Sequence, residues 1–210
     1  MKKSILLILF LALVPMQAAF AQSFEITPSY GTQFGAKLKY GYGYLQAENS
    51  GQIGVTVGLE VRPNVVGELS YYNHSTQLNI KDVDYSPNKS RLSDLNMDWI
   101  FIGANHYLSD NEFVKPFFGG GLGVVFLNPK NENRDIIDFD LHNSTRFSFL
   151  LKGGANFMLT EVIGLNIQGN LFIPVQYGGF YISNGGGGIA TQSTVVFAGL
   201  SAGLVFKLGA

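Results

Sequence analysis

Apolar and polar residues alternate along residues 162–177, and no other pattern constrains the fold of this chain as much. Apolar residues or glycine occupy every second position from Ile163 to Tyr177, and most positions between them are polar, such as Asn166 and Gln168. Because successive side chains of a strand point to opposite faces, the pattern predicts a strand about 50 Å long with one apolar face. A globular core rarely needs such a strand, whereas a tilted strand that crosses a bilayer does.

The N-terminus has the three parts of a secretory signal peptide. Two lysines at positions 2 and 3 are followed by an apolar run over residues 5–14 and by the small-x-small cleavage site Ala-Phe-Ala at residues 19–21. The apolar run is shorter than the ~20 residues of a spanning helix, so we expect cleavage rather than anchoring. The predicted organisation is a signal peptide over residues 1–21 and one domain over residues 22–210.

The composition excludes several kinds of function. The chain has no cysteine, which rules out disulfides, thiol chemistry and lipid attachment through cysteine. Its 15 acidic residues outnumber its 14 basic residues, two of which lie in the signal, and this balance argues against nucleic-acid binding. We expect no cofactor, because no helix follows the glycine run at residues 185–188 to hold a phosphate.

The alternation recurs along the rest of the chain and predicts eight strands. Their expected ranges are residues 24–44, 52–62, 65–72, 95–108, 114–127, 146–157, 162–177 and 196–208. In the fourth range the phase stays open, because either Trp99 and Phe101 or Ile100 and Ile102 could face outward. Asp98 faces inward only if Trp99 faces outward.

The predicted connectors alternate in length. Short connectors fall at residues 62–64, 109–112 and 160–161, and long ones at residues 44–51, 81–91, 128–143 and 178–192. Tight turns at one end and long loops at the other are typical of outer-membrane barrels. Lipid offers no hydrogen bonds, so the sheet must close on itself.

These patterns predict an all-β fold, an eight-stranded antiparallel up-and-down transmembrane β-barrel. The alternative is a soluble eight-stranded barrel or a sandwich with the apolar face inside. Strand length, loop asymmetry and aromatic content favour the membrane barrel. We expect aromatic belts, with Tyr40, Tyr42, Tyr177 and Tyr181 at the outer end and Tyr107 and Phe206 at the inner end.

The polar face of the strands would fill the barrel. An eight-stranded barrel is just wide enough for side chains to occupy its interior, and enclosed charges must pair. We therefore expect a salt-bridged plug, with a narrow channel as the alternative. The expected interior polar network contains Glu25, Lys37, Glu60, Arg62, Glu68, Lys115, Arg146 and Lys152.

Three local motifs carry a family resemblance: the junction at residues 19–22, the glycine-rich strand start at residues 115–123, and the final strand. The chain resembles the small eight-stranded outer-membrane β-barrel family (outer membrane protein beta-barrel domain, similar to the outer-membrane protein A barrel). The resemblance implies a structural or adhesive protein of the bacterial outer membrane, folded by the barrel-assembly machinery. The final strand resembles the signal that this machinery reads, through Ser201, Gly203, Phe206 and Leu208, although the chain ends in Gly-Ala and not in an aromatic residue.

One motif points to catalysis. His142 and Ser144 are two residues apart, so on a strand they share a face, and they resemble the His-x-Ser of outer-membrane lipid A deacylases. An acidic third partner would be Asp138, Asp140 or Glu161. Polar residues beside a loop explain the motif more simply, so we expect no enzyme.

Metal binding has weaker support. His74, His106 and His142 lack ligand spacing. Residues 131–140 form an acidic loop that could bind calcium or divalent ions bridging to lipopolysaccharide, although a solvated loop is the simpler interpretation.

The predicted function is that of an integral outer-membrane barrel with a structural, adhesive or surface-interaction role. We expect a monomer whose partners are the membrane lipid, including lipopolysaccharide, and an external ligand bound by the loops at residues 81–91 and 128–143. The alternatives are a deacylase-like barrel enzyme and a narrow channel.

Overall fold

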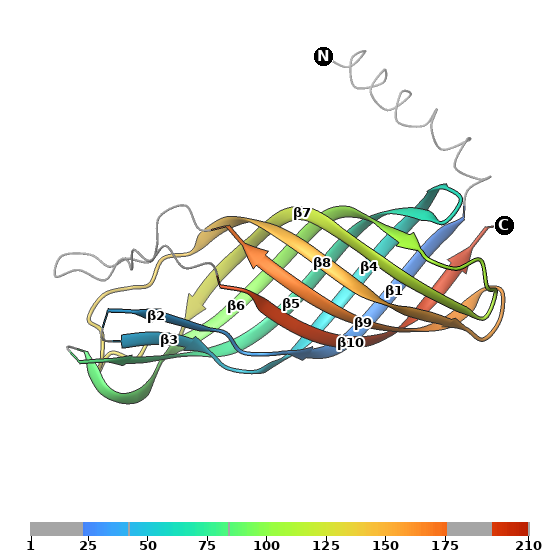
Figure 1. Cartoon of the computed structure of the whole chain (residues 1–210). Coiled ribbons are helices and arrows are strands. Elements are labelled where there is room, and N and C mark those ends of the chain that lie inside the picture. Colours follow the sequence, from blue (N-terminus) through green and yellow to red (C-terminus); the bar gives the residue numbers. More distant parts are fainter. Residues whose placement is uncertain (1–22, 42, 84, 176–194, 210) are drawn as a thin grey trace, which may run out of the picture.

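The computed structural model describes residues 23–41, 43–83, 85–175 and 195–209. No helix among these residues has the length and apolar content needed to cross a bilayer. They form antiparallel strands (Figure 1). The strands are β1 (Phe24–Gln33), β2 (Lys37–Tyr40), β3 (Gly43–Ala47), β4 (Ser50–Arg62), β5 (Val65–Asp82), β6 (Ser86–Tyr107), β7 (Val114–Lys130), β8 (Ser144–Met158), β9 (Ile163–Pro174) and β10 (Phe197–Leu208).

Eight of these strands close into a barrel. β1 pairs with β4, each strand from β4 to β10 pairs with the next, and β10 pairs back with β1, from Phe24↔Leu208 to Gln33↔Gly199. The predicted eight-stranded up-and-down barrel is therefore confirmed. The short turns lie at the end where β1 begins and β10 ends (Figure 1).

The barrel wall is apolar outside and polar inside. Leu165 and Leu200 are 44% and 56% exposed, whereas their neighbours Asn166 and Ser201 are 3% and 5% exposed. A soluble barrel has the opposite arrangement. On β9, the outward-facing residues run from Ile163 to Ile173, ten residue steps along the strand. At about 3.3 Å per step and a tilt of about 40°, they span about 25 Å along the membrane normal. That height matches the apolar band of a transmembrane barrel.

The prediction of one continuous strand over residues 24–44 is wrong. β1 ends at Gln33, and the chain leaves the barrel wall to form the β2–β3 hairpin. Gly35 permits this exit, since a Cβ there would lie 2.3 Å from the Ala47 carbonyl oxygen. The hairpin buries Leu38 and Leu45 on one face, so it continues the alternation that predicted a single strand.

The connector predicted over residues 81–91 is largely strand. β5 and β6 continue past the barrel wall as a hairpin, and β3 joins β5 from Tyr44↔Lys81 to Ala47↔Leu78. The polar composition indicated a loop, but outside the bilayer a paired hairpin can be polar on its exposed face. The three short connectors lie where they were predicted, and most of the fourth long connector lies outside the described residues.

The structure resolves the phase of the fourth predicted strand, now β6. Trp99 and Phe101 are buried inside the barrel, and Ile100 and Ile102 face outward. Asp98 shares the outward phase and accepts a hydrogen bond from the hydroxyl of Tyr71 at 2.6 Å.

The predicted aromatic belts are only partly correct. Tyr107 lies inside the barrel, and Tyr40 packs in the β2–β3 hairpin. Tyr42, Tyr177 and Tyr181 lie outside the described residues. The exposed aromatics near the outer strand ends include Tyr30, Phe34, Tyr71, Phe126 and Phe147, and those near the inner ends include Phe113, Phe118 and Phe157.

Gly123 on β7 allows its neighbour strand to approach closely. A Cβ at this position would lie 1.9 Å from the Ile100 carbonyl oxygen and 2.6 Å from Phe101 Cδ1. We expect Gly123→Val to destabilise the barrel by about 2 kcal/mol or more, because the β6 backbone cannot move aside within the wall. Gly153→Ala is the control, since the nearest atom to its Cβ lies at 3.6 Å. Heat-modifiable gel migration after refolding measures both, and equal folded fractions would contradict the tight fit.

Candidate functional site: the barrel interior and the outer platform

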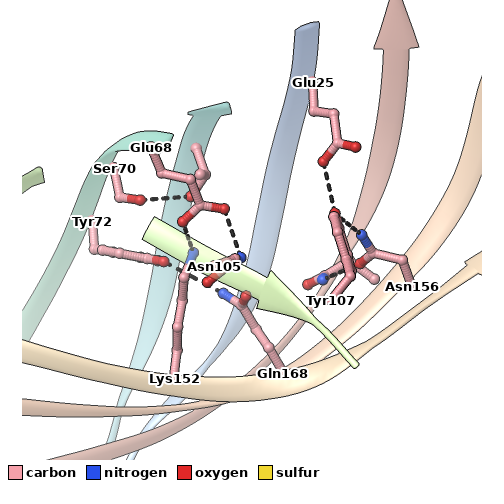
Figure 2. Close-up of polar contacts among 11 residues, drawn as sticks. Glu25, Glu68, Ser70, Tyr72, Asn105, Tyr107, Lys152, Asn156 and Gln168 are labelled. Carbon is pink, nitrogen blue, oxygen red and sulfur yellow. Dashed lines mark hydrogen bonds and ion pairs between the residues drawn. The ribbon is translucent and has the colours of Figure 1, made fainter. Parts of the chain in front are cut away.

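An ion pair crosses the inner half of the barrel. Lys152 Nζ of β8 lies 2.5 Å from Glu68 Oε2 of β5, and both side chains are less than 10% exposed (Figure 2). Asn105 Nδ2 of β6 donates to the other carboxylate oxygen, Glu68 Oε1, at 2.6 Å. The acid is thus satisfied on both oxygens, as an enclosed charge requires.

A second set of hydrogen bonds lies nearer the inner end of the barrel. The Tyr107 hydroxyl donates to Glu25 Oε2 at 2.7 Å and accepts from Asn156 Nδ2 at 2.9 Å (Figure 2). Asn166 Nδ2 donates to Asn156 Oδ1 at 2.6 Å. These contacts join strands from opposite sides of the barrel. We call Glu25, Glu68, Asn105, Tyr107, Lys152, Asn156 and Asn166 the polar network.

Aromatic side chains fill the barrel beyond the polar network, toward the long loops. Trp99 is fully buried, with its ring centroid 5.0 Å from that of Phe172 and 5.8 Å from that of His74. Phe101 stacks on Trp99 at 6.0 Å. We call Tyr72, His74, Trp99, Phe101, Phe172 and Phe197 the aromatic plug. Sequence reasoning expected a polar lumen throughout and missed it, although the inward phase of Tyr72 and Phe172 was a usable signal.

The predicted interior residues separate by their height in the barrel. Glu25, Glu68 and Lys152 belong to the polar network. The other five lie at strand ends or beyond the wall, where solvent reaches them. Lys37 lies in β2 with its Nζ 3.6 Å from the Tyr44 ring centroid, Glu60 and Arg62 end β4, Lys115 begins β7, and Arg146 donates to the Thr145 carbonyl oxygen at 3.3 Å near the outer end of β8.

The residues of the expected assembly signal lie on β10. Ser201 faces the interior and accepts a hydrogen bond from Asn170 Nδ2 at 3.3 Å, whereas Leu208 faces outward. Gly203 lies close to Ser29, since a Cβ atom added at position 203 would lie 3.0 Å from Ser29 Cβ. Phe206 pairs with Ile26 and Ile163 of the neighbouring strands. Recognition of these residues by assembly machinery stays a prediction.

The long loops build a packed structure above the aromatic plug. Ile137 is 3% exposed and belongs to the same buried cluster as Leu38, Leu45 and the plug. The Asn133 N–H donates to the Leu92 carbonyl oxygen at 2.8 Å, which fixes the loop on β6. We call the β2–β3 hairpin, the outer β5–β6 hairpin and residues 131–143 the outer platform.

Ion pairs link parts of the outer platform. Lys89 pairs with Glu48, and its ammonium group is the main cause that lowers the pKa of the Glu48 carboxyl. Arg134 pairs with Asp140 within the loop and likewise lowers the pKa of Asp140.

The candidate catalytic residues form no hydrogen-bonded triad in the part of the chain that the structure describes. His142 is exposed in the loop, Ser144 begins β8, and no hydrogen bond joins them in the described part of the chain. Asp140 is held by Arg134, and Glu161 lies in the turn at the opposite end of the barrel. Across the described ranges, no three histidine or acidic side chains converge as metal ligands would. The calcium prediction for residues 131–140 stays untested.

A closed barrel with an apolar exterior and a filled interior defines an integral membrane β-barrel protein. Residues 6–206 match the family described as the outer membrane protein beta-barrel domain, and the chain belongs to this family. Its place is therefore the bacterial outer membrane, as predicted.

Solved structures share this fold. The outer membrane protein OprG from Pseudomonas aeruginosa is 15% identical, with a TM-score of 0.59 over 90% of this chain and 97% of that chain. Neisserial surface protein A is 15% identical, with a TM-score of 0.58 over 89% of this chain and 97% of that chain. At these identities the likeness concerns the fold alone. No curated protein sequence is significantly similar to this chain.

Proposed function

We propose that this protein is a closed, non-enzymatic scaffold that holds a rigid binding platform at the cell surface. The observations that carry the proposal are the continuous packing from the aromatic plug into the outer platform and the buried ion pair of the polar network in the inner half of the barrel. A lumen filled by side chains leaves no wide aqueous path, which favours a supporting role for the barrel over a channel.

The outer platform has the properties of a pre-organised contact surface. Its loop is fixed by the buried Ile137 and by Asn133, so binding orders few groups and costs little conformational entropy. Its exposed rim carries both signs of charge, which suits specific contact with a protein or glycan. Its charged residues include Lys37, Lys39, Glu48, Lys81, Asp82, Lys89, Arg91, Glu132, Arg134, Asp135, Asp138 and Asp140.

Attachment of whole cells tests the surface role. Cells that display the wild type are compared with cells that display a variant whose residues 131–143 are replaced by a Gly-Ser linker of equal length. The probes are immobilised heparin, collagen, fibronectin and laminin. We expect the wild type to increase attachment to at least one coating and the linker variant to lose the gain. Attachment equal to that of cells without the barrel on all four coatings would contradict the surface role.

Two further measurements address the alternatives. Because His142 and Ser144 form no catalytic pair in the described residues, we expect the mass spectrum of lipid A to be the same with wild type and His142→Ala. Because side chains fill the lumen, we expect no stable conductance in planar bilayers. A changed acylation pattern would support the deacylase hypothesis instead, and stepwise ion currents would support the channel hypothesis.

A further inference from the structure

The outer faces of β5 and β6 change from apolar to polar within two residues. Leu69 and Ile102 are exposed on the apolar band, and Tyr71 with Ile100 forms its upper edge. The next outward pair along the two strands is polar: Asn73 Nδ2 donates to Asp98 Oδ1 at 2.7 Å. This edge marks the height at which lipid acyl chains give way to headgroups.

A cavity of about 550 Å³ lies on the outer wall directly beyond this edge. The segment between β3 and β4 forms one side, and the outer faces of β5 and β6 with the end of β7 form the rest. We call it the outer-wall cavity. Its lining includes Asn49, Ser75, Gln77, Asp94, Asn96 and Lys130.

The acidic groups of the outer-wall cavity are already neutralised. Asp94 Oδ2 lies 2.7 Å from Arg91 Nη2 and accepts from Asn131 Nδ2 at 2.8 Å, and Glu48 pairs with Lys89. Lys130 forms no ion pair within the described ranges. The rest of the lining consists of amides and hydroxyls, some of them already hydrogen-bonded to one another, as Ser75 Oγ is to Asn96 Oδ1 at 2.6 Å, and of the Lys130 ammonium group. That set matches the hydroxyls of a saccharide that carries an anionic substituent.

We propose that the outer-wall cavity binds the saccharide headgroup of a glycolipid in the outer leaflet, with Lys130 against a phosphate or carboxylate of that headgroup. The acyl chains then lie on the apolar band of Leu69, Ile100 and Ile102 directly below. A free glycan has the same chemistry, but only a membrane-anchored one also contacts this band. The site is on the side of the barrel and goes beyond the surface role of the outer platform.

The test uses the full barrel in phosphatidylcholine nanodiscs, titrated with fluorescent rough-type lipopolysaccharide. Ser75→Trp fills the cavity from an exposed outward position, and Lys130→Ala removes the cation. Thr145→Trp is the matched control, because Thr145 is exposed on β8 outside the cavity. We expect saturable binding by the wild type and by Thr145→Trp. We expect the affinity to be about tenfold lower in the two cavity variants, because Lys130→Ala loses a charge-assisted contact and Ser75→Trp loses several neutral ones.

Further measurements distinguish a membrane-anchored glycolipid from a free glycan and check that each variant folds. Deacylated saccharide from the same lipopolysaccharide should compete only at about tenfold higher concentration, since it lacks contact with the apolar band. Equal competition would overturn the lipid-anchored assignment, and equal affinity of wild type and both cavity variants would overturn the site. Each variant must first show heat-modifiable migration, and Lys130→Ala alone suffices if the tryptophan variant does not fold. Neither result bears on cell attachment through the outer platform.

Discussion

Replacing Lys152 with alanine should lower the free energy of unfolding by about 3–5 kcal/mol, because Glu68 is then left as an unpaired charge inside the barrel. Both partners of the ion pair are enclosed, and Asn105 alone cannot replace the ammonium group. Urea unfolding in phospholipid vesicles measures the change. Fluorescence can follow it through Trp99, the single tryptophan of the sequence.

Two controls make this result specific to the buried pair. Lys115→Ala removes a half-buried lysine at the start of β7, and we expect it to cost less than about 1 kcal/mol, as for exposed charges. Combining Lys152→Met with Glu68→Gln removes both charges and should recover most of the lost stability. Equal effects of Lys152→Ala and Lys115→Ala would show that the pair is not enclosed.

Replacing Trp99 with alanine should cost about 3–5 kcal/mol, because it leaves a large void in the aromatic plug. Trp99 contacts Phe101, Phe172 and His74, and the surrounding barrel wall cannot collapse to fill the space. Urea-dependent loss of the folded band on unheated gels measures the change without tryptophan fluorescence.

The adjacent residue supplies the control for Trp99. Ile100 lies on the lipid face, where acyl chains refill the space left by a shorter side chain. We expect Ile100→Ala to lower the free energy of unfolding by less than about 1 kcal/mol, which is a small effect for a single substitution. A larger loss from Ile100→Ala than from Trp99→Ala would reverse the assigned faces of β6.

Alternation predicted the barrel well wherever most of one face of a strand is polar. β9 is such a strand, with Asn166, Gln168 and Asn170 inside and Leu165 outside, and its inner face becomes aromatic only at Phe172. β6 was ambiguous because its inner face is aromatic where it meets the plug, so both faces are apolar there. The first predicted strand ran too far because the β2–β3 hairpin also has one apolar face.

The interior could be predicted only in part, since alternation gives the face of a residue and not its partner or its depth. Glu68 and Lys152 come from strands that do not pair with each other, so no local spacing links them. Lys37 and Arg146 are basic residues in segments of alternating polar and apolar residues, as Lys152 is, yet they lie at the outer end of the barrel. The outer platform depends on Ile137, the buried one of four apolar residues within an acidic segment.

Site-directed labelling in brominated lipid tests the central claim most directly, because the chain has no cysteine and each variant carries a single label. Fluorophores at Leu165→Cys and Leu200→Cys are compared with those at the adjacent positions, Asn166→Cys and Ser201→Cys. Bromine on the acyl chains quenches only fluorophores that contact lipid. We expect strong quenching for the first pair and weak quenching for the second. Strong quenching at positions 166 and 201 with little at positions 165 and 200 would contradict a barrel whose apolar face meets the membrane.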